Sequence, residues 1–496
     1  MNRSLIPLVL SIALAAPAAA AADPLTLSLE GRTAALGEGG AEIAAFDERS
    51  ERVFATNAAA EQLDVYDFSN PASPALVKSV ALGGGPNSVA VRRDGLVAVA
   101  VEASPKTDPG SVRFFDTDGK PLGSVGAGAL PDMLAFTERG TLLVANEGEA
   151  SDDGTVDPEG SVSVIDVNRT ATEISLRTAD FHGVRTSGPV RVVCPGATRA
   201  QDFEPEYVAE GDDGEALVTL QEANAVGVLD VRRARFDVVR SLGFKDHGKT
   251  YNALDPSDRD GGIQIAPWDN LYGMYQPDAI APYEVRGKTL FVTANEGDVR
   301  EREGCEEESR VKDLTLDPTA FPDGEDADEK LGRLTVTETL GDRGGDGDYE
   351  QLYVFGSRSM SILDDDGELV FDTGSELERM AAALEPFAFN ADNVDPVQVD
   401  NRSDNKGPEP EGVTVGQVGR TTYAFLASER QGGIYAYDLS ARRGEARFAG
   451  YLNTRPGDLG PEGLRFVSAH DSPTGGPLLL TTNEISGTIA AISIDD

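Results

Sequence analysis

The sequence predicts an all-β chain built from repeated units, and two recurring phrases lead to this prediction. The first phrase is a short apolar strand that ends in a polar cluster containing Glu. It recurs as LLVANEGE at 142–149, LFVTANEGD at 290–298 and LLLTTNEISGTI at 478–489. Self-similarity at intervals of tens of residues indicates a repeat architecture.

The second phrase marks the start of each unit. It consists of Pro, then an acidic residue or Asn, then an apolar strand. Its copies are Pro86-Asn87, Pro131-Asp132, Pro205-Glu206, Pro277-Asp278, Pro410-Glu411 and Pro461-Glu462. Pro is tolerated at the first residue of a strand, where its missing N–H costs little. Glu42 in AEIAAF fits the same pattern without its Pro.

Counting these starts predicts a β-propeller of seven or eight blades, each a sheet of about four strands around a central channel. The starts lie near Glu42, Asn87, Asp132, Glu206, Asp278, Asp348, Glu411 and Glu462, and the unit near Asp348 is short. We expect the segment from Leu25 to add an outer strand to the last blade and close the ring.

The remaining segments are long insertions and one helix. The insertions cover 180–201, 242–275, 299–342 and 388–406, and per-repeat insertions usually emerge on one face. The segment SELERMAAAL at 375–384 is the clearest helix candidate. Because the repeats run almost end to end, we expect residues 23–496 to form one propeller domain.

The first 22 residues predict a secretory signal peptide, with a basic start at Arg3, an apolar stretch and small residues before Asp23. No later segment is apolar enough to span a bilayer. We therefore expect an exported monomer, in the periplasm or outside the cell. In such a compartment Cys194 and Cys305 can pair, but their spacing leaves pairing and free thiols equally open.

The formal net charge is -42, from 43 basic and 85 acidic residues. This balance excludes nucleic acid as a partner, because binding there requires neutralised phosphates. Two explanations of the acid remain open: a solvated acidic surface, and calcium sites built from carboxylates and carbonyls. With three histidines, a His-rich zinc or copper centre is not expected.

Two sets of positioned acids are the candidate calcium ligands. The strand-start acids should begin the innermost strands and ring one mouth of the channel; they are Asp132, Glu206, Asp278, Glu411 and Glu462. The strand-end glutamates should lie beside them; they are Glu147, Glu222, Glu296, Glu429 and Glu484. Like charges gathered at one mouth are costly unless cations hold them. The alternative for each residue is that it caps a turn within its own blade.

Two acidic runs are further, local candidates. One contains Asp342, Asp346, Asp348 and Glu350, and the other contains Asp255, Asp258 and Asp260 before two glycines. Neither has a complete EF-hand spacing, and solvated acidic turns are the alternative.

Several long motifs resemble the choice-of-anchor I family. They are DGDYEQLYVFGSRSMSILDDDGELVFDTGSELE from Asp346, DNKGPEPEGVTVG from Asp404, SERQGGIYAYD from Ser428, NALDPSDRDGGIQI from Asn252 and YQPDAIAPYEVRGKTLFVTANEGDVRE from Tyr275. The family includes mesenchyme-specific cell-surface glycoproteins of biomineralising animals. The resemblance covers essentially the whole mature chain and implies a propeller fold, export and calcium association. Some members carry an alkaline phosphatase label, and PEPEG resembles a motif of phytase-like propellers.

The resemblance and the charges leave two functions open. In the first, a metal-dependent phosphoesterase, calcium ions of unknown number activate water. Arg300, Arg358 and Arg430 lie in or after the strand-end loops and would grip the phosphate of a small substrate. In the second, a non-catalytic surface or matrix protein binds calcium, mineral or a macromolecular partner, and the arginines pair with the glutamates. A sugar- or peptide-binding propeller is disfavoured because the single Trp, Trp268, offers no recurring aromatic platform.

Overall fold

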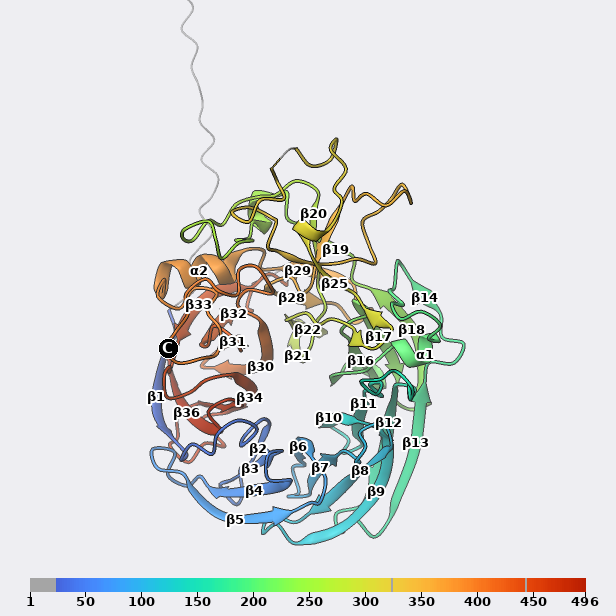
Figure 1. Cartoon of the computed structure of the whole chain (residues 1–496). Coiled ribbons are helices and arrows are strands. Elements are labelled where there is room, and N and C mark those ends of the chain that lie inside the picture. The colour runs from blue at the N-terminus through green and yellow to red at the C-terminus, as the bar shows by residue number, and fades with distance from the viewer. Residues whose placement is uncertain (1–23, 323, 442–443) are drawn as a thin grey trace, which may run out of the picture.

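Four-stranded antiparallel sheets are arranged in a ring around a central axis, as Figure 1 shows in a view along that axis. The computed structural model describes residues 24–322, 324–441 and 444–496. The predicted signal peptide lies outside these residues. Seven sheets form the ring in the described part of the chain, so the propeller has seven blades.

The first three blades follow one another without long interruptions. Blade 1 contains β2 (Ala44–Asp47), β3 (Arg52–Asn57), β4 (Gln62–Asp67) and β5 (Ala75–Ala81). Blade 2 contains β6 (Pro86–Val91), β7 (Val97–Val101), β8 (Pro109–Phe115) and β9 (Pro121–Ala129). Blade 3 contains β10 (Pro131–Phe136), β11 (Leu142–Asn146), β12 (Ser161–Val167) and β13 (Ile174–Asp180). Each blade runs outward from its first strand to its fourth.

Blades 4 and 5 carry additions. Blade 4 contains β15 (Val208–Glu210), β16 (Glu215–Leu220), β17 (Ala225–Asp230) and β18 (Arg235–Ser241), with β14 (Thr186–Ser187) as a fifth strand parallel to β18. Blade 5 contains β21 (Ile280–Val285), β22 (Lys288–Asn295), β28 (Ser359–Leu363) and β29 (Leu369–Asp372). The chain between β22 and β28 leaves the ring.

The last two blades complete the circle. Blade 6 contains β30 (Pro410–Val418), β31 (Thr421–Ser428), β32 (Ile434–Asp438) and β33 (Arg447–Leu452). Blade 7 contains β34 (Pro461–Val467), β35 (Leu478–Asn483), β36 (Thr488–Asp495) and β1 (Thr26–Arg32). Since β1 pairs antiparallel with β36, from Thr26 with Asp495 to Arg32 with Ala490, the predicted closure by the N-terminal strand is confirmed.

The middle strands of the blades are apolar on both sides because neighbouring blades cover both faces. All five residues of β7, VAVAV, are buried. Short continuous apolar runs bounded by turns are typical of such strands. The core is therefore a series of layers between blades, in which Phe54 and Phe425 have no exposed surface.

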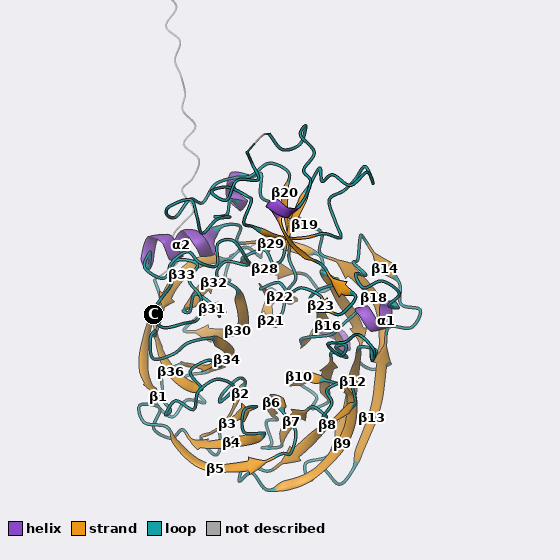
Figure 2. Ribbon diagram, viewed as in Figure 1, coloured by secondary structure: helices purple, strands orange, loops and turns teal. Residues whose placement is uncertain are grey.

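The outer elements are short (Figure 2). The helices are α1 (Arg199–Asp202) and α2 (Glu376–Leu384), so the predicted helix at 375–384 is confirmed. Single 3₁₀ turns occur at Asp212–Gly214, Thr250–Asn252 and Val311–Asp313. The additional strands are β19 (Phe244–Asp246), β20 (Leu271–Met274), β23 (Glu301–Arg302), β24 (Cys305–Glu306), β25 (Glu308–Arg310), β26 (Thr335–Thr337) and β27 (Leu352–Val354). No helix in the described ranges is long and apolar enough to cross a membrane.

The predicted unit start near Asp348 is wrong. Asp348 lies in the insertion between β22 and β28, and the strand that follows it, β27, pairs in parallel with β20 outside the ring. The acidic turn imitates a unit start, but the three-residue strand after it has no hairpin partner in a blade.

The predicted insertions meet one another. A disulfide between Cys194 and Cys305 joins the first insertion to the third. Arg333 of the third insertion forms ion pairs with Asp258 of the second and Asp404 of the fourth. These contacts gather the four insertions in one region beside blades 4 to 6.

Candidate functional site

The strand registers bring the two predicted sets of acids together. In blade 3, Pro131 pairs with Asn146, so Asp132 and Glu147 lie at the same end of the sheet. Blade 6 pairs Pro410 with Ser428, immediately before Glu429. Blade 7 repeats the arrangement, since Pro461 pairs with Asn483 immediately before Glu484. The strand-start acids and strand-end glutamates therefore form two tiers at one mouth of the channel.

All five strand-start acids line a single cavity of about 140 Å³ in the channel. The other lining residues are Ile43, Asn87, Ser88, Met133 and Tyr207. No basic side chain of the described residues lines it. The placement predicted from the Pro-acid phrase is confirmed, and what the acids bind stays a prediction.

Burial makes the ionised form of these acids costly. Burial, with the nearby charge of Glu102, raises the pKa of Asp132 to about 7. Burial and neighbouring carboxylates hold the pKa values of the other four well above the ordinary range for Asp and Glu. Beside them, burial and the charge of Glu484 raise the pKa of Glu42 to about 8. The cavity therefore needs either protons or a bound cation.

Several carboxylate oxygens in the cavity have no partner. One oxygen each of Glu411 and Glu462 is buried without a hydrogen bond. Glu206 is 8% exposed, and its carboxylate makes no hydrogen bond or ion pair within the described residues. Orphaned buried acceptors are rare in native proteins and indicate a missing ion, proton or water.

Tyr207 contributes a phenol to the same cavity. Burial and the charges of Asp278, Glu462, Asp132 and Glu411 raise the pKa of this phenol well above its ordinary value. The hydroxyl therefore stays protonated and can donate a hydrogen bond to a ring carboxylate or to water. Sequence reasoning missed Tyr207 because alternation along a strand predicts that the residue after Glu206 points away. Tyr207 lies before β15 begins, where alternation does not apply.

The backbone before the strand starts is strained. Leu130, Gln276 and Glu409 have φ values of 44°, 43° and 50°, and each precedes a strand-start Pro. Non-Gly residues rarely adopt this region, and the ring of a following Pro restricts them further. Such strain persists only where the surrounding structure enforces it, and it concentrates at functional sites.

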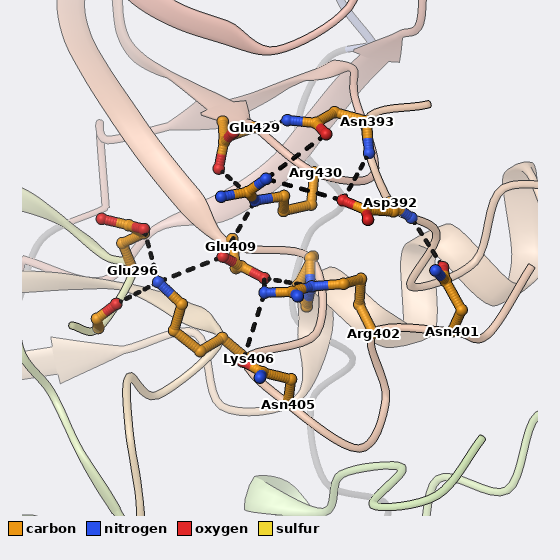
Figure 3. Close-up of polar contacts among 12 residues, drawn as sticks. Glu296, Asp392, Asn393, Asn401, Arg402, Asn405, Lys406, Glu409, Glu429 and Arg430 are labelled. Atoms are coloured by element: carbon orange, nitrogen blue, oxygen red, sulfur yellow. Dashed lines mark hydrogen bonds and ion pairs between the residues drawn. The ribbon is translucent and has the colours of Figure 1, made fainter. Parts of the chain in front are cut away.

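In blades 5 and 6 the outer tier is neutralised by bases (Figure 3). Carboxylate oxygens of Glu296, Glu409 and Glu429 lie within 4.8 Å of one another, which is a spacing suited to a metal. Lys406 lies among them: its Nζ is 2.9 Å from Glu296 Oε1 and 3.2 Å from Glu409 Oε2.

Two arginines complete this charge balance. Arg402 forms an ion pair with Glu409, and Arg430 Nε is 2.8 Å from Glu429 Oε2 and 3.4 Å from Glu409 Oε2. The nearby cations, Lys406 first, hold the pKa of Glu409 below its usual value despite burial. Three acids face three bases, so the group is an ion-pair cluster. Sequence reasoning did not identify Glu409 as a member of this cluster, because nothing in the sequence indicates that a charged residue before Pro410 is buried.

In blades 3 and 4, Arg300 lies among the acids of the outer tier. It forms an ion pair with Glu204, and its Nη1 is 3.4 Å from Glu222 Oε1. Glu147 and Glu222 remain strongly perturbed, since burial and nearby acids hold their pKa values well above the usual range. Burial also raises the pKa of Glu484, the blade 7 member.

The three arginines proposed to grip a phosphate do not converge on the cavity. Arg358 is 3% exposed, pairs with Glu378 at 2.7 Å and donates to the carbonyls of Asp255, Ser403 and Asn405. Arg300 is 6% exposed and lies in its own cluster with Glu204 and Glu222. Arg430 is the most accessible, with 33% of its side chain exposed. Each arginine is thus engaged by carboxylates, and the arrangement is that of a structural network.

The local acidic runs are turns in the structure. Asp342 accepts hydrogen bonds from the backbone of Gly345, Asp346 and Gly347. Oxygens of Asp317, Asp348 and Glu350 lie within 4.8 Å of one another at a partly exposed position. In the other run, Asp255 accepts from Ser257 and Gln264, and Asp258 pairs with Arg333 and Arg259.

Comparison with known proteins confirms the resemblance seen in the motifs. The sequence model of the choice-of-anchor I domain matches residues 42–442. Gigasin-3a of Magallana gigas is 31% identical over 191 residues, which are 34% of this chain and 66% of Gigasin-3a. The mesenchyme-specific cell surface glycoprotein of Strongylocentrotus purpuratus is 28% identical over 200 residues, 33% of this chain and 26% of that protein. The chain spans less than two thirds of the length of either relative.

Solved structures resemble the chain only in overall shape. Hydrazine synthase of Kuenenia stuttgartiensis aligns with a TM-score of 0.49 and 12% identity, over 92% of this chain and 96% of that one. The WD40 repeats of RRP9 align with a TM-score of 0.49 and 7% identity, over 96% and 98% of the two chains. Virginiamycin B lyase from Staphylococcus aureus aligns with a TM-score of 0.45 and 8% identity, over 95% and 99%.

Proposed function

Since the chain belongs to the choice-of-anchor I family, we propose that it is an exported, non-catalytic surface or matrix protein whose channel binds calcium. The observation that carries the proposal is the cavity lined by five carboxylates and by no described basic side chain. Calcium is a hard cation with oxygen ligands and flexible geometry, and this cavity offers oxygen donors only.

The spacing of the acids indicates how the cation is held. No three strand-start acids have oxygens within 4.8 Å of one another, unlike the cluster around Lys406. A cavity of about 140 Å³ has room for several waters, since one water occupies roughly 30 Å³ of liquid volume. We therefore place the ion between carboxylates with water completing its coordination.

The relatives support the cellular setting of the proposal. The name of the Strongylocentrotus purpuratus relative describes a cell surface glycoprotein. A protein at a cell surface meets calcium at millimolar concentration, and extracellular calcium modules bind with Kd of about 10⁻⁴–10⁻³ M. A site of that affinity is filled in such a setting.

The phosphoesterase hypothesis ranks second. It requires basic groups free to bind phosphate oxygens beside the cation. Arg300 and Arg358 are buried in ion pairs, and Arg430, the most accessible of the three, is shared by Glu409 and Glu429. The geometry therefore favours binding without hydrolysis.

Calorimetric titration of calcium into chelator-treated protein tests the proposal. We expect saturable binding with Kd of about 10⁻⁴–10⁻³ M, weakened at least tenfold in Glu462→Gln. Glu368→Gln is the matched control because it removes an exposed acid that pairs with Arg240 outside the cavity, and it should leave that binding intact. The absence of binding at millimolar calcium, or equal loss in both variants, would contradict the proposal.

A further inference from the structure

The strand-start phrase has a third position that differs between blades. In blades 6 and 7 the acid is followed by glycine, in Pro410-Glu411-Gly412 and Pro461-Glu462-Gly463. In blades 3, 4 and 5 the residues after the acid are Met133, Tyr207 and Ala279. Neither glycine has positive φ, so backbone conformation does not require glycine at these positions.

What requires glycine is the approach of the next blade. A Cβ on Gly412 would lie 1.8 Å from the carbonyl oxygen of Glu462. A Cβ on Gly463 would lie 2.7 Å from the carbonyl oxygen of Glu42 and 2.4 Å from Thr482 Oγ1. The hydroxyl of Thr482 itself bonds to the Glu42 carbonyl. The innermost strands of blades 6, 7 and 1 therefore touch through their backbones at the level of the acids.

Two fully buried oxygens without a hydrogen bond occur in this sector, which comprises the innermost strands of blades 6, 7 and 1. Of the strand-start acids, Glu411 and Glu462 are those with a buried oxygen that lacks a hydrogen bond. Both carboxylates line the cavity, while Met133 and Tyr207 fill part of its wall elsewhere. Close backbone approach thus coincides with carboxylates that have been brought together and left without partners.

We infer that Gly412 and Gly463 are positioning residues for the cation site of the channel. By allowing the strands to approach, they hold Glu42, Glu411 and Glu462 close together, and the cation binds in this sector. The inference rests on the proposed calcium function and adds to it the position of the ion and what sets that position. A side chain at either glycine separates two neighbouring strands and with them the carboxylates.

Gly412→Ala tests the inference, with Gly416→Ala as its matched control. Both glycines lie on β30 and face β34; a Cβ on Gly416 would meet the ring of Phe466 at 2.2–2.4 Å. Four residues of strand separate the two positions by roughly 13 Å. The control therefore introduces a clash between the same two strands, but at a position distant from the acids.

Terbium luminescence and calcium calorimetry measure the outcome, with circular dichroism to establish folding. We expect Gly412→Ala to weaken binding about 10–100-fold, the usual effect of disturbing groups that orient metal ligands. Gly416→Ala should stay within about threefold of the parent affinity, even with a similar loss of thermal stability. Equal weakening in both variants overturns the inference, since it reports general loosening of the blades.

A second comparison applies if Gly412→Ala does not fold. Thr482→Val removes the hydroxyl that bonds to the carbonyls of Glu42 and Gly463 and keeps a side chain of nearly the same shape. We expect it to weaken terbium binding, and Glu411→Gln and Glu462→Gln to do so more than Asp132→Asn. Unchanged binding in Thr482→Val, or a larger loss in Asp132→Asn, overturns the inference. Failure of the parent protein to bind either cation instead refutes the proposed function.

Discussion

At the scale of the residue, the strand-start acids are costly wherever no cation or proton neutralises them. Carboxylates at the channel mouth of a folded protein keep their protons to a higher pH than they do in the unfolded chain. From the sequence, these acids could be predicted only to form a ring of negative charge. The sequence could not show which acids form ion pairs, because basic residues such as Lys406 and Arg300 contact acids from distant parts of the chain.

The raised pKa values predict a pH dependence of stability without calcium. Burial raises the pKa of Asp132 to about 7 and that of Glu42 to about 8. Below the ordinary carboxyl pKa, these acids are protonated in both the folded and the unfolded protein. As the pH rises above it, they lose their protons first in the unfolded protein. Stability must therefore fall as pH rises from about 5 to about 8.

Thermal unfolding in chelator at several pH values measures this effect. We expect Tm to decrease across that window, and to decrease less with millimolar calcium. The lowered pKa of Glu409 adds stability only above its own titration range, so it does not reverse the trend within the window. A flat or rising Tm in chelator would contradict the assignment of buried, unneutralised acids.

The structural role of Arg358 predicts a large loss of stability on its removal. Arg358→Met leaves the buried carboxylate of Glu378 without its cation, which costs about 3–5 kcal/mol. Arg235→Met, at an exposed ion pair with Asp237, should cost no more than about 1 kcal/mol. Denaturant unfolding compares the two variants, and the double variant Arg358→Met with Glu378→Leu should recover part of the loss. Equal, small effects would contradict the structural role.

At the scale of the element, local phrases predicted the blades because each phrase encodes one supersecondary unit. Pro at a strand start and the buried run of β7 are visible without any neighbour. The unit near Asp348 was misassigned because strand partners are not local: β27 pairs with β20, which lies in another insertion. The same reason left the pairing of Cys194 with Cys305 open in the sequence.

The closing strand β1 gives a prediction at this scale. Leu27 is 8% exposed and packs in the core with Ile492 and Ile494, whereas Leu29 on the same strand is 38% exposed. Leu27→Ala should cost about 2–5 kcal/mol, as for other buried leucines. Leu29→Ala should cost under about 1 kcal/mol because surface substitutions are usually small. Chemical denaturation of both variants checks this, and similar costs would argue against closure by β1.

At the scale of the whole molecule, the channel mouth is asymmetric. The acids of the outer tier at blades 5 and 6 are neutralised by Lys406, Arg402 and Arg430. At blades 3 and 4, the acids of the outer tier lie near Arg300. The strand-start acids below them have no such partners among the described residues. Within a chain of net charge -42, the channel therefore holds a group of crowded acids with no basic partner in the described part of the cavity wall.

The paired arginines predict that the protein does not hydrolyse phosphate esters. Purified protein loaded with calcium should release no phosphate from an aryl phosphate at neutral or alkaline pH, above the level seen with chelator. Calcium-dependent release of phosphate that disappears in both Glu411→Gln and Arg430→Met would contradict our ranking of calcium binding above phosphoesterase activity.

Calcium-dependent thermal unfolding of the parent protein and of the double variant Glu411→Gln/Glu462→Gln tests the central claim most directly. The account predicts that calcium raises Tm of the parent, since ligand at 100 times Kd stabilises by about 2.7 kcal/mol. The double variant should show no such shift, and its Tm in chelator should equal or exceed that of the parent because two buried acids that are costly to ionise are gone. Equal calcium shifts in both proteins, or no shift in the parent, would contradict the claim that the channel acids bind calcium.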